Sequence, residues 1–272
     1  MPDDSARFIA IEATADLLRW RLPLTARLCM GPPDRLGMWG GVGVGGAVAA
    51  LEAALDQPIV WASAQFVSAA GVPDTLEIEV VPLARGRAVT QARATARVGE
   101  REVLTVSAAL GAREPPIAHQ SLTAPDVPPP DACEPAGHWG AGGAPDVHRR
   151  IECRVAAGGY AGARGVQLGN APGRVALWLR PTEPVALDAP LLAVLADFAP
   201  SCMDDALGRR TSGGSLDNTI RFADVRPTPW VLCDITLDAA HRGFGHSTSR
   251  LFTEAGELLA VASQTVSIRV HD

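Results

Sequence analysis

The sequence contains no lysine, so all 24 of its basic residues are arginines. No side chain is therefore available to form a Schiff base with a carbonyl substrate, which excludes lysine-based covalent catalysis. The basic residues are outnumbered by 30 acidic residues, and the formal charge is −6. Broad nucleic-acid binding needs a basic surface, so we expect no nucleic-acid partner.

Paired cysteines, long apolar runs and a GxSxG motif are also missing. The five cysteines are scattered without a CxxC pair, which predicts buried thiols and no metal site. The longest apolar-rich segment, residues 41–55, is too short to span a bilayer and contains Glu52. The chain opens with MPDDSARFIA, which lacks the features of a signal peptide. We therefore expect a cytoplasmic protein with no membrane partner, and not a serine α/β-hydrolase.

A length of 272 residues, of which 47% are apolar, suits two small domains. Residues 113–146 are rich in Pro and Gly without a sustained hydrophobic period, which is typical of a linker. The sequence thus predicts an N-terminal domain over residues 1–112 and a C-terminal domain over residues 147–272.

The two halves resemble each other. Arg85–Leu110 and Arg242–Val270 both begin with Arg-Gly, continue as a strand, turn at a Gly-Glu pair and return as an apolar strand. Upstream, Ile59–Ala84 and Ser215–Ala240 each contain two strands separated by a turn with proline. This order predicts the same antiparallel unit twice.

Each half also contains one apolar segment that is typical of a buried helix, residues 41–55 and Ala189–Leu207. The GVGVGG run in the first segment lacks the GK[ST] ending of a phosphate loop, so we interpret it as a helix start packed closely on a sheet. The expected fold class is α+β, with each central helix wrapped by a curved antiparallel sheet.

One helix in a curved sheet, present twice in one chain, is similar to the double-hotdog acyl-CoA thioesterases. The C-terminal half carries the closest resemblance: LLAVLADF, then SLDNTIRF, then LLAVASQTVSIRV. Their order resembles the type II pattern, in which an Asp, a Thr and a Gln hold the attacking water. The resemblance implies a tandem hotdog fold, hydrolysis of acyl-CoA without a cofactor, and a site of Asp197, Ser215 and Gln264.

The chemistry of thioester hydrolysis is consistent with these three residues. A carboxylate can draw a proton from water as it attacks, and Asp197 lies in an apolar run where burial would raise its pKa. Ser215 stands where the family has Thr, which keeps the hydroxyl but loses the methyl that restricts χ1. The oxyanion is expected to meet backbone N–H groups at a helix N-terminus, which the sequence does not identify.

The first half serves as an internal control. Alignment of the repeats places apolar or small residues opposite the three site residues, namely Leu51 for Asp197, Ile59 for Ser215 and Ser107 for Gln264. We therefore predict one active site per chain, in the C-terminal half, with a structural N-terminal half.

Other residues near the expected site have less defined roles. Period-two alternation with Leu216 facing the core places Ser215, Asp217 and Thr219 on the opposite face. We expect a mainly structural role for Asp217, with substrate binding as the alternative. Arg209 and Arg210 are candidates for binding a phosphate of CoA, or they lie in a solvated loop.

Two other functions are open at this point. A hotdog-type enoyl-CoA hydratase commonly uses an Asp and a His a few residues apart, and no His closely follows Asp197. A non-catalytic acyl-binding protein is the second alternative. Sheet edges favour pairing of hotdog units, so a homodimer of chains is a further expectation.

Overall fold

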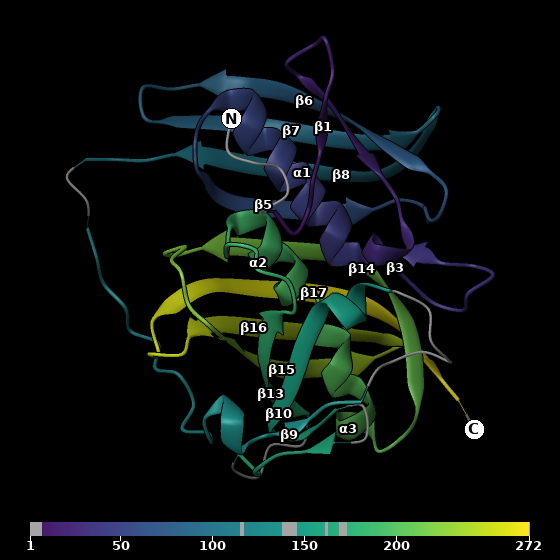
Figure 1. Cartoon of the computed structure of the whole chain (residues 1–272), viewed down its shortest axis with the longest axis vertical. Coiled ribbons are helices and arrows are strands. Elements are labelled where there is room, and N and C mark those ends of the chain that lie inside the picture. Colours follow the sequence, from purple (N-terminus) through teal and green to yellow (C-terminus); the bar gives the residue numbers. More distant parts are fainter. Residues whose placement is uncertain (1–6, 115–116, 138–145, 161–162, 169–172, 272) are drawn as a thin grey trace.

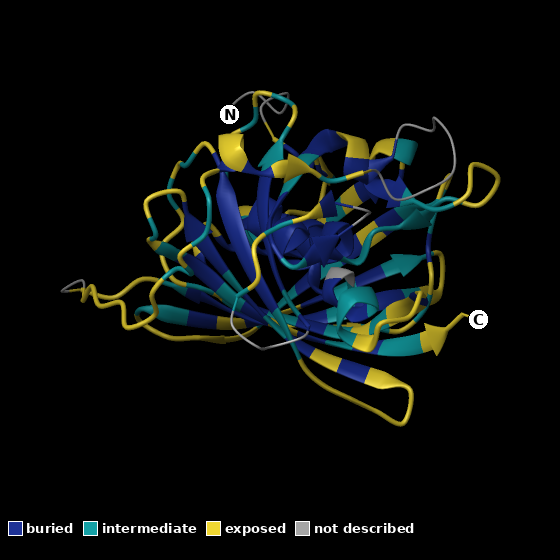
Figure 2. Ribbon diagram, turned by 90° about the horizontal axis from the view of Figure 1, so that it is seen from below, coloured by how far each residue is buried: buried dark blue, intermediate teal, exposed yellow. Residues whose placement is uncertain are grey.

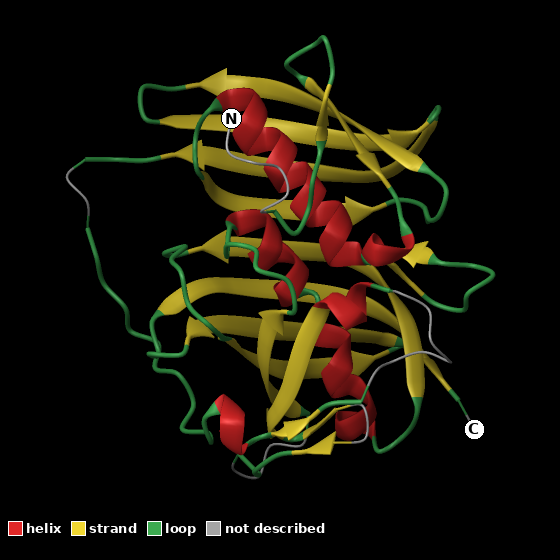
Figure 3. Cartoon of the chain, viewed as in Figure 1, coloured by secondary structure: helices red, strands yellow, loops and turns green. Residues whose placement is uncertain are grey.

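The computed structural model describes residues 7–114, 117–137, 146–160, 163–168 and 173–271. Within these ranges the chain forms one 13-stranded antiparallel sheet that curves around its helices (Figure 1 and Figure 3). No helix in the described ranges is long and apolar enough to cross a membrane. The large antiparallel sheet and the few helices agree with the predicted α+β tandem hotdog architecture.

The N-terminal half of the chain builds one half of the sheet, and the C-terminal half builds the other. In order across the sheet, the first half contains β1 (Glu12–Ala13), β2 (Arg19–Pro23), β6 (Thr75–Arg85), β7 (Val89–Val98), β8 (Arg101–Gly111) and β5 (Ile59–Phe66). The sheet continues with β14 (Thr211–Phe222), β17 (Leu258–Val270), β16 (Phe244–Thr253), β15 (Val231–His241), β13 (Arg174–Pro181), β10 (Ile151–Ala157) and β9 (Glu134–Pro135). The two halves therefore share one continuous sheet, joined where β5 pairs with β14.

The helices lie inside the curve of this sheet. Helix α1 (Gly40–Leu55) and helix α2 (Ala189–Ala196) are buried over most of their length, and Figure 2 shows them enclosed by the sheet. A helix that is apolar nearly all round is stable in such a place because every face contacts apolar atoms. The remaining elements are short: α3 (Met203–Leu207), the 3-10 helices η2 (Ala26–Leu28), η3 (Pro130–Ala132), η4 (Val147–Arg150) and η5 (Ala199–Cys202), and the strand pairs β3 (Cys29–Met30) with β4 (Gly37–Met38) and β11 (Gly159–Tyr160) with β12 (Ala163–Arg164).

The predicted helical segment Ala189–Leu207 is divided into three parts, α2, η5 and α3. The first part ends at Asp197, whose φ of −84° and ψ of 12° lie outside the helical region. Pro200 has no N–H to donate and disfavours a helical conformation in the residue before it, which explains the break. The break places Asp197 at the C-terminus of α2 instead of in the middle of a longer helix.

The strand register confirms the internal repeat. Ser63 on β5 pairs with Thr219 on β14, and their hydroxyl oxygens lie 2.7 Å apart. These two residues are 156 positions apart, the same offset that aligned Ile59 with Ser215, so at this central pair of the ladder a residue meets its own counterpart in the repeat. Both strands also contain a register shift at equivalent places, between Ile59 and Trp61 and between Ser215 and Asp217. The repeat is therefore structural as well as sequential.

One part of the sequence alignment is corrected by the register. Ser63 pairs with Ser107 on β8, and Thr219 pairs with Ser263 on β17, so the counterpart of Gln264 is Ala108. Alignment on the hairpin glycines gave Ser107, which is one residue off. Between the equivalent pairs Arg93–Ser107 and Thr248–Ser263, the β16–β17 hairpin contains one residue more than the β7–β8 hairpin, so its glycine is displaced relative to the strands. Ala108 has no side-chain amide, so the first half still has no counterpart of the Gln264 amide.

The expected alternation along β14 is wrong at its N-terminal end. The register shift between Ser215 and Asp217 leaves Leu216 as a bulge residue, and its side chain is 43% exposed. Asn218 is buried and shares the inner face with Ser215, while Asp217 and Thr219 lie on the other side. A β-bulge adds one residue to one strand, so the residues of β14 that precede the bulge point to the opposite faces from those that the alternation predicts.

The glycines of α1 allow two kinds of close approach. A Cβ on Gly46 would meet Leu22, and one on Gly43 would meet Met38 and Leu104, so Leu22 on β2 and Leu104 on β8 show the expected packing on the sheet. A Cβ on Gly41 or Gly45 would instead meet the backbone of α2, at 2.8 Å from Cα of Val194 and 2.6 Å from the carbonyl oxygen of Pro190. The glycines therefore also set the distance between the two helices.

We expect Gly45→Ala to lower the free energy of unfolding and Gly46→Ala to leave it unchanged or raise it. Alanine favours a helix over glycine by up to about 1 kcal/mol at both positions. At Gly45 the new methyl meets a backbone carbonyl that has no room to move, which costs about 1–3 kcal/mol. At Gly46 it meets the end of the Leu22 side chain, which can rotate. Urea denaturation of both variants measures the difference, and equal values would contradict this account.

Residues 113–146 pack against the protein where they are described. Trp178 on β13 donates its indole N–H to the carbonyl of Pro128 at 2.9 Å, and β9 extends the sheet by pairing with β10. A second apolar cluster lies on this side of the sheet and includes Trp178, Trp230 and Phe252, with Val127 against it. The segment between the halves thus covers the outer face of the C-terminal half, and the domain boundaries stay a prediction.

Candidate active site

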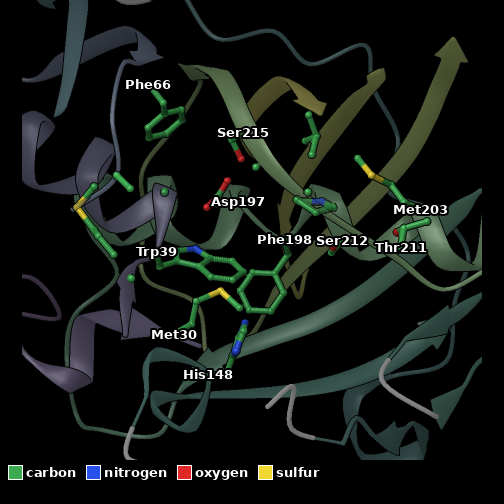
Figure 4. Close-up of a pocket in the computed structure, with 18 of the residues that line it drawn as sticks. Met30, Trp39, Phe66, His148, Asp197, Phe198, Met203, Thr211, Ser212 and Ser215 are labelled. Carbon is green, nitrogen blue, oxygen red and sulfur yellow. The ribbon is translucent and has the colours of Figure 1, made fainter. Parts of the chain in front are cut away.

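A cavity of about 630 Å³ lies between the two halves of the chain, and Figure 4 shows the side chains that line it. The first half contributes Met30, Gly37, Met38, Trp39, Gly40 and residues 66–70. The second half contributes His148, Tyr160, Asp197, Phe198, Pro200, Met203, Asp204, residues 211–215 and Val266. Most of these side chains are apolar or aromatic, as is usual for a ligand pocket with a few placed polar groups.

Asp197 is the buried acid of this cavity, with 4% of its surface exposed. Its Oδ2 accepts a hydrogen bond of 2.7 Å from the backbone N–H of Gly41, in the first turn of α1. Its Oδ1 accepts from the amide of Gln264 at 2.7 Å and, at 3.4 Å, from the amide of Asn218. Two side-chain amides and one backbone N–H therefore hold the carboxylate.

Burial raises the pKa of Asp197 to about 6, because the charged form loses contact with water. The hydrogen bonds from Gly41, Gln264 and Asn218 act in the opposite direction and prevent a larger rise, since they stabilise the anion. A carboxylate with this pKa is ionised at neutral pH but basic enough to accept a proton in a reaction.

The three predicted site residues lie together. The amide nitrogen of Gln264 donates both to Asp197 and to the hydroxyl oxygen of Ser215, so it connects the acid with the hydroxyl. Asp197 and Ser215 both line the cavity, and Figure 4 shows their side chains close to each other. Because Ser215 accepts from Gln264, its own O–H is available as a donor.

The bulge at Leu216 is what brings Ser215 into this group. Asn218 pairs directly with Gln264 across β14 and β17, and Ser215 pairs with Val266. Ser215 and Asn218 are three positions apart, so in a regular strand their side chains would lie on opposite faces. The extra residue removes that difference, and both side chains reach Gln264 or Asp197.

The three residues with possible roles in substrate binding lie elsewhere. Asp217 accepts a hydrogen bond of 2.9 Å from the backbone N–H of Thr265, so it supports the ladder next to the bulge. Arg209 and Arg210 are exposed in the turn between α3 and β14. None of the three is among the described residues that line the cavity, although Thr211 and Ser212 directly follow the arginines and do line it. Their contact with CoA stays a prediction.

The sequence interpretation missed three groups of the site. Asn218 is a polar residue on the strand face that the alternation assigns to the core. A polar side chain on a core face was the one signal in the sequence that pointed to a site there. Gly41 donates from the backbone, which no side-chain pattern reveals. His148 lies within η4, next to the expected linker; it lines the cavity and contacts Trp39 at a ring-centroid distance of 4.6 Å.

Comparison with known proteins identifies the family. The model of the acyl-CoA thioesterase C-terminal domain matches residues 130–268. Among solved structures, a candidate thioesterase from Novosphingobium aromaticivorans is 32% identical, with a TM-score of 0.86, over 96% of this chain and 98% of that chain. A comparison with curated proteins finds no match.

Two more distant structures agree in fold. A conserved protein of unknown function with a hotdog fold from Alicyclobacillus acidocaldarius is 19% identical, with a TM-score of 0.82, over 99% of this chain and 98% of that one. Acyl-CoA thioesterase II from Mycobacterium marinum is also 19% identical, with a TM-score of 0.76, over 97% and 98% of the two chains.

The chain belongs to the acyl-CoA thioesterase family, because the family model covers just over half of it and the 32% identical relative covers nearly all of it. It is a thioester hydrolase with a tandem hotdog fold, which confirms the resemblance, the fold class and the enzyme class. The family assignment favours hydrolysis of acyl-CoA over hydration of an enoyl-CoA and over acyl binding without turnover.

Proposed function

We propose that the chain hydrolyses its acyl-CoA substrate with a water held by Asp197 and Ser215, and that Gln264 positions both side chains. The observation that supports this most directly is the buried carboxylate, which lies at the cavity wall within 2.7 Å of the Gln264 amide that also reaches Ser215. A carboxylate of raised pKa next to a hydroxyl is suited to act as a general base on water.

In this mechanism the water donates one proton toward Asp197 and accepts the hydroxyl hydrogen bond of Ser215. Its oxygen forms a bond to the carbonyl carbon of the thioester while Asp197 takes the proton. The tetrahedral intermediate then loses its C–S bond, so that the acid and the CoA thiolate separate. The proton held by Asp197 is released to the thiolate or to solvent, and the carboxylate is ready for another turnover.

The start of α1 is placed to stabilise the oxyanion. Gly40 is the first residue of α1 and lines the cavity next to Asp197, and the N–H groups of a first helical turn have no partner within their own helix. A Cβ on Gly40 would lie 2.9 Å from Oδ2 of Asp197 and 3.2 Å from the ring of Phe66, so glycine keeps this space open. We assign the backbone N–H of Gly40 as an oxyanion donor, aided by the helix dipole.

The assignment predicts different effects for two variants of Ser215. We expect Ser215→Ala to lower kcat by about 10–100-fold, since the water loses one of its two anchors. Ser215→Thr is expected to retain most activity, because it keeps the hydroxyl. The measurement is release of free thiol from a panel of acyl-CoAs. An Ala variant as active as the wild type would remove Ser215 from the mechanism.

Two further features belong to this proposal. Binding of CoA phosphates by Arg209 and Arg210 would be tested by the KM for acyl-CoA in the double Ala variant.

A homodimer of chains remains a prediction, to be tested by the mass in solution.

A further inference from the structure

A second, smaller cavity lies next to the active-site cavity. It has a volume of about 140 Å³ and is lined by Ile151 and Cys153 on β10, by residues 135–137 and by Glu152. Three residues, His148, Tyr160 and Phe198, line both cavities. The two spaces thus adjoin at these three side chains, which we call the ring wall.

The ring wall is built by edge contacts between aromatic groups. The ring of Phe198 lies at centroid distances of 5.9 Å from His148 and 6.2 Å from Tyr160, both in edge-to-face geometry. Trp39 supports it from the first half, 5.5 Å from Phe198. Such pairs are favourable and give each ring a preferred orientation. Figure 4 shows the rings of Trp39, Phe198 and His148 next to one another, below Asp197 in the view.

The exposure of the lining residues indicates where CoA and the acyl group would lie. Ser212, Gly213, Gly214 and Ala69 are exposed, so this part of the lining is open to solvent. The charged and bulky CoA must remain at this rim, since burial of its phosphates would be very unfavourable. The acyl group then extends inward, past Asp197 toward the buried ring wall.

The chamber behind the wall suits an apolar chain. Ile151 is buried, and the Cys153 thiol is neutral because burial raises its pKa. The one charged residue, Glu152, is directed to the guanidinium groups of Arg154 and Arg180, with oxygen–nitrogen distances of 2.7–3.0 Å. A space of 140 Å³ holds roughly four or five carbon atoms, if each needs about the 30 Å³ of a water molecule.

We propose that the ring wall of Phe198, His148 and Tyr160 determines the acyl length that this enzyme accepts, and that the chamber behind it is an unused extension of the acyl site. This rests on the proposed function, because it places the reacting carbon at Asp197. The active-site cavity of 630 Å³ holds roughly twenty heavy atoms. If about half of them belong to the pantetheine arm, the wall limits the acyl group to roughly ten carbons.

The test opens the wall and then fills the chamber behind it. In His148→Ala, the ratio of kcat/KM for dodecanoyl-CoA to that for octanoyl-CoA is expected to rise about tenfold or more, because each additional methylene buried in the chamber strengthens binding. Cys153→Leu alone should leave the ratio at the wild-type value, since the chamber is closed. The double variant His148→Ala/Cys153→Leu should return the ratio toward wild type.

A ratio unchanged in a folded His148→Ala variant, or a gain that Cys153→Leu does not reverse, would overturn the proposal. If His148→Ala does not fold, Phe198→Leu opens the same wall and the same ratio applies. Dissociation constants of alkyl-CoA thioethers, which cannot be hydrolysed, give the length preference without turnover. If the variant and the wild type showed the same dependence of these constants on alkyl length, the proposed role of the ring wall would be refuted. A wrong catalytic assignment of Asp197 would leave the change in length preference in place.

Discussion

Asp197→Asn is expected to lower kcat for acyl-CoA hydrolysis by about 10²–10⁴-fold while the protein stays folded. The substitution conserves shape but removes the group that accepts the proton from water. The amide of Gln264 can rotate to match it, because its Oε1 is buried without a hydrogen-bond partner among the described residues and can accept from the new amide. Thiol-release assays with the variant measure the loss.

Stability provides a second measurement on this variant. The pKa of Asp197 is about 6 in the fold and 3.8 as its ordinary value, so folding favours the protonated form. Its contribution to stability is complete below pH 3.8 and is lost as the pH rises through 6. At pH 8 the wild type therefore contains an unfavourable buried charge, and Asp197→Asn should be more stable there by about 2–3 kcal/mol. The two proteins should converge near pH 3.

Glu52→Gln is the matched control for the loss of activity. Like that of Asp197, the pKa of Glu52 is raised by burial. Glu52 lies within α1, is partly buried, and accepts a hydrogen bond of 2.9 Å from the N–H of Ile59. It is not among the described residues that line the cavity. We expect it to retain activity within about twofold, as is usual for changes outside a site. Comparable losses in both variants would contradict the assignment of Asp197.

Gln264→Leu is expected to cost about 10–100-fold in kcat at pH 7 and to move the acidic limb of the pH–activity profile upward. Asp197 then loses one of its two hydrogen bonds of 2.7 Å, and its pKa rises because the anion is less stabilised. A hydrogen bond to a charged group is worth about 1.5–3 kcal/mol, or about one pH unit or more. Part of the lost activity should return at pH 8–9.

The shape of this profile separates two roles of Gln264. In the wild type, activity should fall as the pH drops below about 6, when Asp197 becomes protonated. If Gln264 acts through Asp197, the variant shows the same fall at a higher pH. A uniform loss without a displaced limb would mean that Gln264 acts on the substrate or on Ser215 alone. Asn218→Leu should give a smaller displacement, since its contact of 3.4 Å is weaker.

Much of the architecture was predictable because local patterns match the final structure. The hairpins were identified from β-compatible runs around glycine turns, and Gly99 and Gly256 adopt positive φ angles of 59° and 85°. The buried helix of residues 41–55 was identified from its continuous apolar composition and begins one residue earlier in the structure. The repeat and the family resemblance then identified Asp197, Ser215 and Gln264 as neighbours.

The errors have a common physical origin. The sequence alone does not show a β-bulge, since Leu216 is an ordinary strand residue and becomes exposed only through its register with β17. The alternation therefore concealed Asn218 and grouped Ser215 with Asp217. The end of the helix at Asp197 depends likewise on Pro200 and on the close crossing of α1 at Gly41.

By itself the sequence determined the class of fold and the repeat, because these follow from hydrophobic period and turn chemistry. The residues of the candidate site came from the resemblance of its motifs to the family. The tertiary structure decided which groups meet. It placed the N–H of Gly41 on Asp197, turned Ser215 and Asn218 to one face, and built the ring wall from His148, Tyr160 and Phe198. These contacts join residues far apart in the chain, and their register and packing exist only once the two halves share one sheet.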